Sequence, residues 1–268
     1  MSSVRPRRRV AAVLAGVLAV ATLAAGCGGG DGGEATIGDT VRTTQPAVTT
    51  TPPSTTAPLP EWASEVAQAR VPSLQVFPEP GAAAPSMELP NPWVYDPDHP
   101  DQTIPQVFLV KEHRTDGWVK VLLPVRPNGS TGWVRTADVS VTRNPYRIEV
   151  SLGEHRIRVT RESNVVYEGT VAIGKPSTPT PLGEFYLRIL IQSIEPDSVY
   201  GPYAYGLSSH SETLDTFAGG EAQVGIHGNN DPSVLGSDVT SGCIRIDNDA
   251  ITMLSTQLPL GTPVEVVA

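Results

Sequence analysis

Residues 146–173 read YRIEVSLGEHRIRVTRESNVVYEGTVAI and contain three apolar runs separated by turn residues. In the first run, Ile148 and Val150 alternate with charged residues, which is the period of a strand with one buried face. The pair Gly153–Glu154 predicts a turn, and two further strands are predicted over residues 155–159 and 165–173. The stretch therefore predicts a three-stranded meander.

The sequence after this meander predicts more strands and one helix. Residues 182–191 and 263–267 have strand sequences. The helix is predicted to open near Asn248 as its N-cap and to end before Pro259, with Ile251, Leu254 and Leu258 on one face. Many short strands and a single helix predict a mainly β domain over residues 145–268.

A second β region is predicted over residues 61–144. Its best ordered part is a hairpin in which Gly117–Leu123 and Gly132–Val134 flank a turn at Arg126–Gly129. The repeated Gly-Trp-Val pattern resembles bacterial SH3-like domains, which implies a small β-barrel. Such a barrel could bind a wall ligand or act as a spacer with Trp118 and Trp133 in its core, and the spacer interpretation is favoured.

The first 26 residues have the pattern of an export signal. Four arginines, the first at Arg5, precede an uncharged run over Val10–Gly26 that ends in small residues. The segment Leu23–Cys27 resembles a bacterial lipobox, which implies that Cys27 is lipidated after removal of residues 1–26. The alternative is a plain secretory signal. A lipid anchor predicts a protein on the outer face of the cytoplasmic membrane, facing the cell wall.

Residues 27–60 are predicted to be the lipidated Cys27 followed by a disordered tether. Residues 28–60 contain 9 Thr, 6 Gly and 5 Pro and almost no large apolar side chain. Such a composition buries too little surface to offset chain entropy, so no secondary structure is expected.

The overall composition narrows the classes of partner. The 268 residues include 28 acidic and 19 basic ones, which argues against binding of nucleic acid. No metal site is expected, since the two cysteines lie far apart and His99, His113 and His155 lack metal-ligand spacing. No glycine-rich phosphate loop is found, and no cofactor is expected.

Cys243 and His227 are the candidate catalytic pair. A free thiol is mostly protonated at neutral pH, so a nucleophilic cysteine needs a base, and His227 can take its proton. The small-residue turn Ser241-Gly242-Cys243 can direct backbone amides at an oxyanion. No carboxylate adjoins His227, so the carbonyl of Gly228 is the candidate acceptor for its other ring nitrogen.

Several motifs accompany this pair: Ile226-His227-Gly228, Thr240-Ser241-Gly242-Cys243-Ile244-Arg245, Thr178–Phe185 and Gly261–Val264. Together they resemble the L,D-transpeptidase (YkuD) catalytic domain over residues 145–268. The resemblance implies a β-sandwich-like fold, a Cys243 nucleophile, a His227 base and peptidoglycan stem peptides as donor and acceptor. It also implies carbapenem β-lactams as covalent inhibitors.

The resemblance assigns further residues to the substrate. Arg245 is placed to hold the site or to meet a substrate carboxylate. His210, Tyr203 and Tyr205 lie in the stretch where the family has a flap over the substrate. An exposed loop histidine is as good an interpretation of His210. The two tyrosines could flank the donor peptide or pack the loop, and a cleft role is favoured for one of them. Many members have Ser-His-Gly-Cys where this chain has Ser241 before Gly242, so any substrate contact by that histidine is absent.

The expected reaction is a cross-link between third residues of two stem peptides through a Cys243 acyl-enzyme. One alternative is an L,D-carboxypeptidase, in which water resolves the same acyl-enzyme. Another is a non-catalytic wall-binding lipoprotein, which does not require the retained Cys243 and His227.

Overall fold

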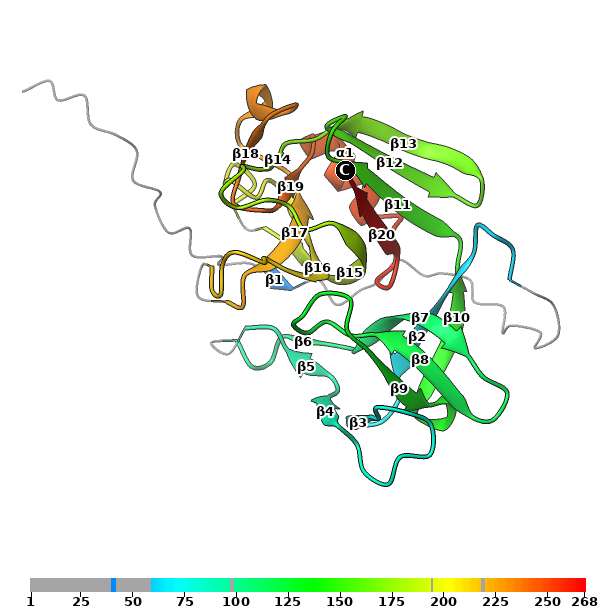
Figure 1. Cartoon of the computed structure of the whole chain (residues 1–268). Coiled ribbons are helices and arrows are strands. Elements are labelled where there is room, and N and C mark those ends of the chain that lie inside the picture. Colours follow the sequence, from blue (N-terminus) through cyan, green and yellow to red (C-terminus); the bar gives the residue numbers. More distant parts are fainter. Residues whose placement is uncertain (1–39, 42–58, 97–98, 194, 218–219) are drawn as a thin grey trace, which may run out of the picture. The chain divides into compact units, whose positions relative to one another are not determined.

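The computed structural model describes residues 40–41, 59–96, 99–193, 195–217 and 220–268. Strands make up about half of these residues, which include one α-helix, α1 at Asn248–Ser255 (Figure 1). The predicted mainly β fold is confirmed. The predictions for residues 1–26 and Cys27, and for most of the tether, lie outside the described residues.

The larger sheet contains the predicted meander. Its strand order is β13-β12-β11-β20-β15-β16-β17-β19. The bounds are β11 Tyr146–Ser151, β12 Arg156–Arg161, β13 Asn164–Thr170, β15 Gly183–Gln192, β16 Tyr203–His210, β17 Gln223–His227, β19 Ile244–Arg245 and β20 Pro263–Val267. Ile148 and Val150 of β11 are buried and Glu149 is exposed, as the alternation predicts. The final strand β20 joins β11 in parallel and β15 in antiparallel register.

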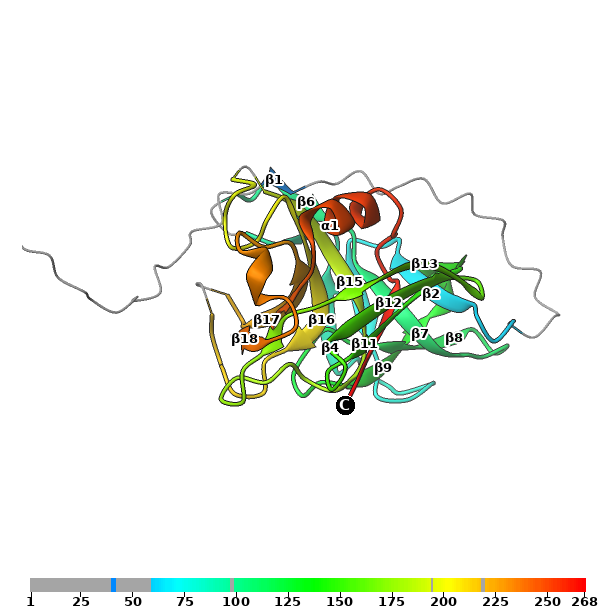
Figure 2. The ribbon, with the colours of Figure 1, turned by 90° about the horizontal axis from the view of Figure 1, so that it is seen from above.

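Helix α1 begins one residue away from the predicted cap. The N-cap is Asp247, whose Oδ1 accepts hydrogen bonds from the amides of Asp249 (2.9 Å) and Ala250 (3.2 Å). Both Asp and Asn are good caps, and the Asn248 side chain has another partner, described below. The helix lies against β16 (Figure 2). No helix within the described ranges is long and apolar enough to cross a membrane.

The predicted hairpin belongs to a five-stranded sheet in the N-terminal region. The strand order is β10-β2-β7-β8-β9. The bounds are β2 Ser64–Ala69, β7 Val107–His113, β8 Trp118–Leu122, β9 Thr131–Arg135 and β10 Val139–Asn144. Trp133 is buried, and the ring of Trp118 meets Phe77 edge-on at 5.2 Å. The SH3-like character of this region stays a prediction.

Short two-stranded pairs complete the described secondary structure. They are β3 Ser73–Val76 with β4 Met87–Pro90, β5 Trp93–Val94 with β6 Thr103–Ile104, and β14 Ile173–Gly174 with β18 Asp238–Thr240. In addition, β1 (Thr40–Val41) pairs with β15. This two-residue strand lies in the segment for which the sequence predicts no regular structure.

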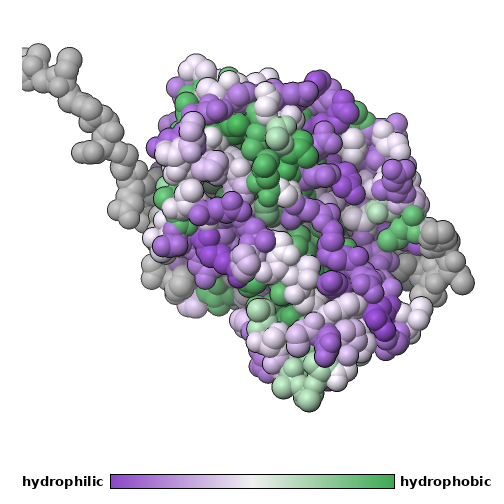
Figure 3. Space-filling model, in the orientation of Figure 1, coloured by the Kyte–Doolittle hydropathy of each residue, from purple (hydrophilic) through white to green (hydrophobic). Residues whose placement is uncertain are grey.

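The N-terminal β region packs directly against the larger sheet. The Asn144 side-chain amide donates to Thr262 Oγ1 at 3.0 Å, and Lys111 forms an ion pair with Glu184. Gly261, with φ +86°, approaches Val66 so closely that an added Cβ would lie 2.3 Å from Val66 Cγ1. Buried apolar side chains of both sheets form one cluster. The face shown in Figure 3 is mostly hydrophilic, with a hydrophobic patch at its upper centre and smaller ones elsewhere.

Candidate active site

Cys243 and His227 lie on neighbouring strands of the larger sheet. His227 is the last residue of β17, and Cys243 directly precedes β19. The two strands run in parallel with Ile226 opposite Ile244, which places Cys243 beside Gly225. Both side chains line one cavity of about 460 Å³. Residues sixteen apart in sequence are thus brought to a common site.

The imidazole of His227 is buried and held in one orientation. Its Nδ1 lies 2.7 Å from the carbonyl oxygen of Gly228, the acceptor predicted from the sequence. A neutral imidazole that donates from Nδ1 leaves Nε2 as its acceptor. The ring of Tyr200, which was not predicted, packs against the imidazole with 5.0 Å between ring centroids. Nε2 is therefore the atom that can take a proton.

An asparagine pair fixes the loop that follows His227. The Asn229 amide donates to Asn248 Oδ1 at 2.8 Å, and Asn248 Nδ2 donates to the Asn229 carbonyl at 2.9 Å. A Cβ on Gly228 would lie 2.2 Å from Asn248 Oδ1, so only glycine fits there. The sequence offered Asn248 as a helix cap, and nothing in it indicated this second role.

Burial keeps both members of the pair uncharged. It lowers the pKa of His227 to about 4, with a smaller contribution from the positive charge of Arg245, against the opposing hydrogen bond to Gly228. Burial also raises the pKa of the Cys243 thiol, although the Gly225 backbone and Arg245 oppose this. At neutral pH the site therefore holds a thiol and a neutral imidazole rather than an ion pair.

The low pKa of His227 predicts a loss of stability in acid. The unfolded chain binds this proton with a pKa of about 6.5. The contribution of His227 to the free energy of unfolding is therefore full above that pH. It falls by on the order of 3 kcal/mol as the pH approaches about 4. Urea unfolding between pH 7.5 and 4.5 should show this loss, and His227→Gln should reduce it. His155→Gln, at a half-exposed position, should retain it; equal losses in all three proteins would contradict the assignment.

The turn before Cys243 is locked by two threonines. Thr240 Oγ1 accepts from the Gly242 amide at 3.1 Å and donates to the Cys243 carbonyl at 2.6 Å. Thr180 Oγ1 donates to the Gly242 carbonyl at 2.9 Å, and φ of Gly242 is +119°. The prediction of Gly242 as an oxyanion donor is therefore corrected, since its amide already has a partner. The amides of Ser241 and Cys243 remain the candidates.

Arg245 lies opposite His227 in the pairing of β17 and β19. Paired residues of neighbouring strands share a face of the sheet, so Arg245 is on the same face as His227. Its Nε is buried and has no hydrogen-bond partner among the described residues. Arg245 is not among the residues that line the cavity of Cys243 and His227, and its contact with a substrate carboxylate stays a prediction.

The two predicted tyrosines differ in their surroundings. Tyr205 is buried and lines the cavity, but its hydroxyl contacts the carbonyls of Leu254 (3.2 Å) and Leu258 (3.0 Å) at the end of α1. Tyr203 is half-buried and is absent from the cavity lining. Its carbonyl accepts a hydrogen bond from the amide of Gly228 at 3.2 Å. Tyr205 is thus mainly an anchor for the helix.

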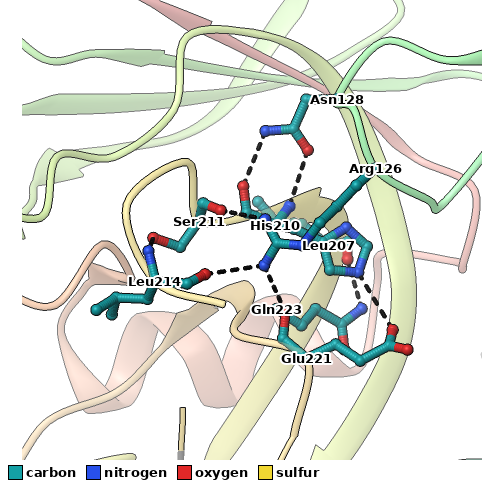
Figure 4. Close-up of polar contacts among 8 residues, drawn as sticks. All are labelled: Arg126, Asn128, Leu207, His210, Ser211, Leu214, Glu221 and Gln223. Atoms are coloured by element: carbon teal, nitrogen blue, oxygen red, sulfur yellow. Dashed lines mark hydrogen bonds and ion pairs between the residues drawn. The ribbon is translucent and has the colours of Figure 1, made fainter. Parts of the chain in front are cut away.

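His210 is buried in the cavity wall, so the exposed-loop interpretation is wrong. Its backbone is held by Asn128, which accepts from the His210 amide at 2.9 Å and donates to its carbonyl at 2.8 Å (Figure 4). Beside it, Arg126 donates to three carbonyl oxygens, those of Ser211, Leu214 and Glu221. A loop of the N-terminal region therefore clamps the segment that follows β16, which was not predicted.

The other histidines contact carboxylates. The pairs are His99 with Asp96 (2.8 Å), His113 with Glu65 (3.2 Å) and His155 with Asp238 (2.6 Å). Within the part of the chain that the structure describes, no group of three histidine, cysteine or acidic side chains is placed to hold a metal ion.

Comparison with known proteins identifies the family of the region that contains this site. The family model of the L,D-transpeptidase catalytic domain (YkuD) matches residues 145–266. The Bacillus subtilis protein named "Putative L,D-transpeptidase YkuD" is 34% identical over 122 residues, which are 46% of this chain and 66% of that protein. "Putative L,D-transpeptidase YqjB" of the same organism is 30% identical over 131 residues, 45% of this chain and 70% of that protein. The chain belongs to the L,D-transpeptidase (YkuD) family.

The match spans somewhat less than two thirds of the length of the YkuD protein. Among solved structures, the LD transpeptidase LdtMt1 in complex with imipenem is similar with a TM-score of 0.36 and 19% identity. That similarity covers 56% of this chain and 90% of the other.

Proposed function

We propose that this protein is a peptidoglycan L,D-transpeptidase that joins the third residues of two stem peptides through an acyl-enzyme on Cys243. The observation that supports this most directly is the shared cavity of Cys243 and His227, with Nδ1 of the imidazole held by Gly228. The arrangement supplies a nucleophile and an oriented base, the two groups that acyl transfer requires.

In the proposed first half-reaction, Cys243 Sγ attacks the carbonyl carbon between the third residue and the terminal D-Ala. His227 Nε2 takes the thiol proton as the carbon–sulfur bond forms. The C–N bond then breaks, and the same proton passes to the leaving amine of D-Ala. The amides of Ser241 and Cys243 are the proposed donors to the oxyanion. The product is a thioester.

In the second half-reaction, the side-chain amine of a diamino acid on another stem attacks the thioester carbonyl. His227 takes a proton from this amine and returns it to Sγ as the C–S bond breaks. The product is a cross-link between third residues, and the thiol is regenerated. The neutral thiol and neutral imidazole described above are the starting state that this cycle needs.

The function is tested with a stem tetrapeptide as donor and a stem tripeptide as acceptor. Mass analysis of the products of the purified chain should show a cross-linked peptide together with released D-Ala. Tripeptide and D-Ala without cross-link would instead identify an L,D-carboxypeptidase. Intact peptides that nevertheless bind the protein would support the non-catalytic wall-binding alternative. Imipenem, the ligand in the LdtMt1 complex, is a suitable probe for covalent addition.

We also propose that the protein is anchored to the outer face of the cytoplasmic membrane by lipid on Cys27. The support is the small-residue segment that precedes Cys27. A labelled fatty acid fed to expressing cells should therefore mark the protein, and Cys27→Ala should remove the label and release the protein from membranes. Cys243→Ala is the matched control and should keep the label. Label that persists in Cys27→Ala would contradict the anchor.

A further inference from the structure

The N-terminal β region forms part of the wall of the catalytic cavity. Trp93, Val94 and Tyr95, which lie at and just after β5, line the same space as Cys243. The rings of Trp93 and Tyr95 meet edge-on with 5.8 Å between their centroids. The spacer interpretation favoured from the sequence is therefore incomplete, because this region also contributes side chains to the cavity wall.

Arg188 lies directly against this aromatic wall. The pairing of β15 with β16 shifts between Leu187 and Ile189, so that Arg188 is the extra residue of a β-bulge. Bulges redirect a side chain and are common beside active sites. Here the guanidinium carbon of Arg188 lies 3.9 Å from the centre of the Trp93 ring, and the residue lines the cavity.

The hydrogen-bond donors at this end of the cavity are unused. Arg188 Nε and Trp93 Nε1 are buried without a hydrogen-bond partner among the described residues. A buried donor without an acceptor is costly, and each such group calls for an explanation. A ligand oxygen that accepts from these groups would satisfy them.

The charge around His210 is positive. Arg126 and Arg188 both lower its pKa, after burial as the largest cause, and Glu221 is the acid that opposes them. Glu221 Oε2 lies 3.6 Å from His210 Nε2, and its side chain is mostly exposed. Two guanidinium groups and one carboxylate thus act on His210, and an arginine keeps its charge at any physiological pH. The unsatisfied groups therefore favour an anionic oxygen ligand.

The distance from Arg188 to the nucleophile matches a short peptide. Cys243 lies beside Gly225, Gly225 pairs with Gly206, and Gly206 pairs with Ile189, the neighbour of Arg188. Three strand-to-strand steps of about 4.8 Å give roughly 14 Å. An extended peptide of about four residues has this length. Gly206 and Gly225 line the cavity between the two ends and place no side chain there.

We propose that Arg188, supported by the ring of Trp93, forms a carboxylate subsite that binds the stem peptide at the end of the cavity remote from Cys243. The proposal rests on the proposed function for the identity of the peptide. Guanidinium groups bind carboxylates through charge-assisted hydrogen bonds, which are stronger than neutral ones. The N-terminal region thereby contributes to substrate recognition through Trp93.

Calorimetric binding of a stem tetrapeptide to the full chain carrying Cys243→Ala tests this without requiring turnover. Arg188→Gln in that background should raise the Kd by about 10- to 100-fold, as expected for loss of a hydrogen bond to a charged group. Arg188→Lys should recover part of the affinity because it keeps the charge. Arg158→Gln, which removes an exposed arginine paired with Glu168, is the control and should leave the Kd unchanged.

Tetrapeptides with one carboxylate amidated at a time identify the group that is bound. One of these amidated peptides should bind weakly to the protein that retains Arg188, and Arg188→Gln should cause no further loss of its affinity. An equal effect of Arg188→Gln on every peptide, or none on any, would overturn the subsite. A sensitive peptide that nevertheless yields neither D-Ala nor cross-link with intact Cys243 would refute the proposed function and leave the subsite standing.

Discussion

Cys243→Ser should lower the rates of D-Ala release and of cross-link formation by about 10⁴-fold or more. The reason is that a hydroxyl is far harder to ionise than a thiol. The neutral imidazole of His227 can therefore accept a proton from a thiol far more readily than from a hydroxyl. The measurement is the rate of D-Ala release from a stem tetrapeptide. In parallel, imipenem should add covalently to the unsubstituted protein, with the adduct mapped by mass spectrometry to Cys243.

The other cysteine of the chain supplies the matched control. Cys27→Ala should keep the full rate of D-Ala release in solution and the imipenem adduct, because Cys27 belongs to the proposed anchor. An adduct on any residue other than Cys243, or full turnover by Cys243→Ser, would disprove the assignment of the nucleophile.

His227→Ala should slow acylation of Cys243 by about 10²- to 10⁴-fold at pH 7. With a pKa of about 4, the imidazole is already in its base form at neutral pH, so the unsubstituted protein should react at a nearly constant rate from about pH 5 to 8. Without this base, only thiolate reacts, and the rate should rise about tenfold for each pH unit until the raised pKa of the thiol is reached. The two proteins should therefore converge in alkali.

Stopped-flow measurement of imipenem addition between pH 5 and about pH 10 gives these profiles. His155→Ala, which changes a histidine that precedes β12 and pairs with Asp238 of β18, should follow the unsubstituted curve. A His227→Ala protein with an unchanged, flat profile would show that another group activates the thiol.

Much of the fold could be predicted from local sequence pattern. Alternation over residues 146–152 specified which face of β11 is buried, and the same rule gave β12, whereas β15 and β20 were predicted from their strand-forming residues. The helix start was misplaced by one residue because Asp247 and Asn248 are equally good caps locally. The choice depends on Asn229, which lies nineteen residues away and occupies the Asn248 side chain.

Site residues that belong to a short sequence motif could be predicted. Those whose role depends on contacts between distant segments could not. Cys243 and His227 follow from short motifs, but the parallel pairing that unites them is not visible in sequence. Arg188 has the appearance of an ordinary polar position in a strand, and the bulge that redirects it arises only from its register with β16. Likewise, the sequence made Tyr205 a cleft candidate, whereas in the structure its hydroxyl donates hydrogen bonds to backbone carbonyls at the end of α1.

The hydrogen bonds made by Arg126 and Asn128 determine the shortest segment of this chain that could be transferred into another protein. A graft of residues 145–268 alone would lack every side-chain donor that Arg126 and Asn128 supply to the carbonyls of residues 210, 211, 214 and 221. It would also lose Trp93 from the cavity. A graft that begins near residue 59 would carry both, so the segment needed for building chimeric enzymes is about 1.7 times as long as the family domain suggests.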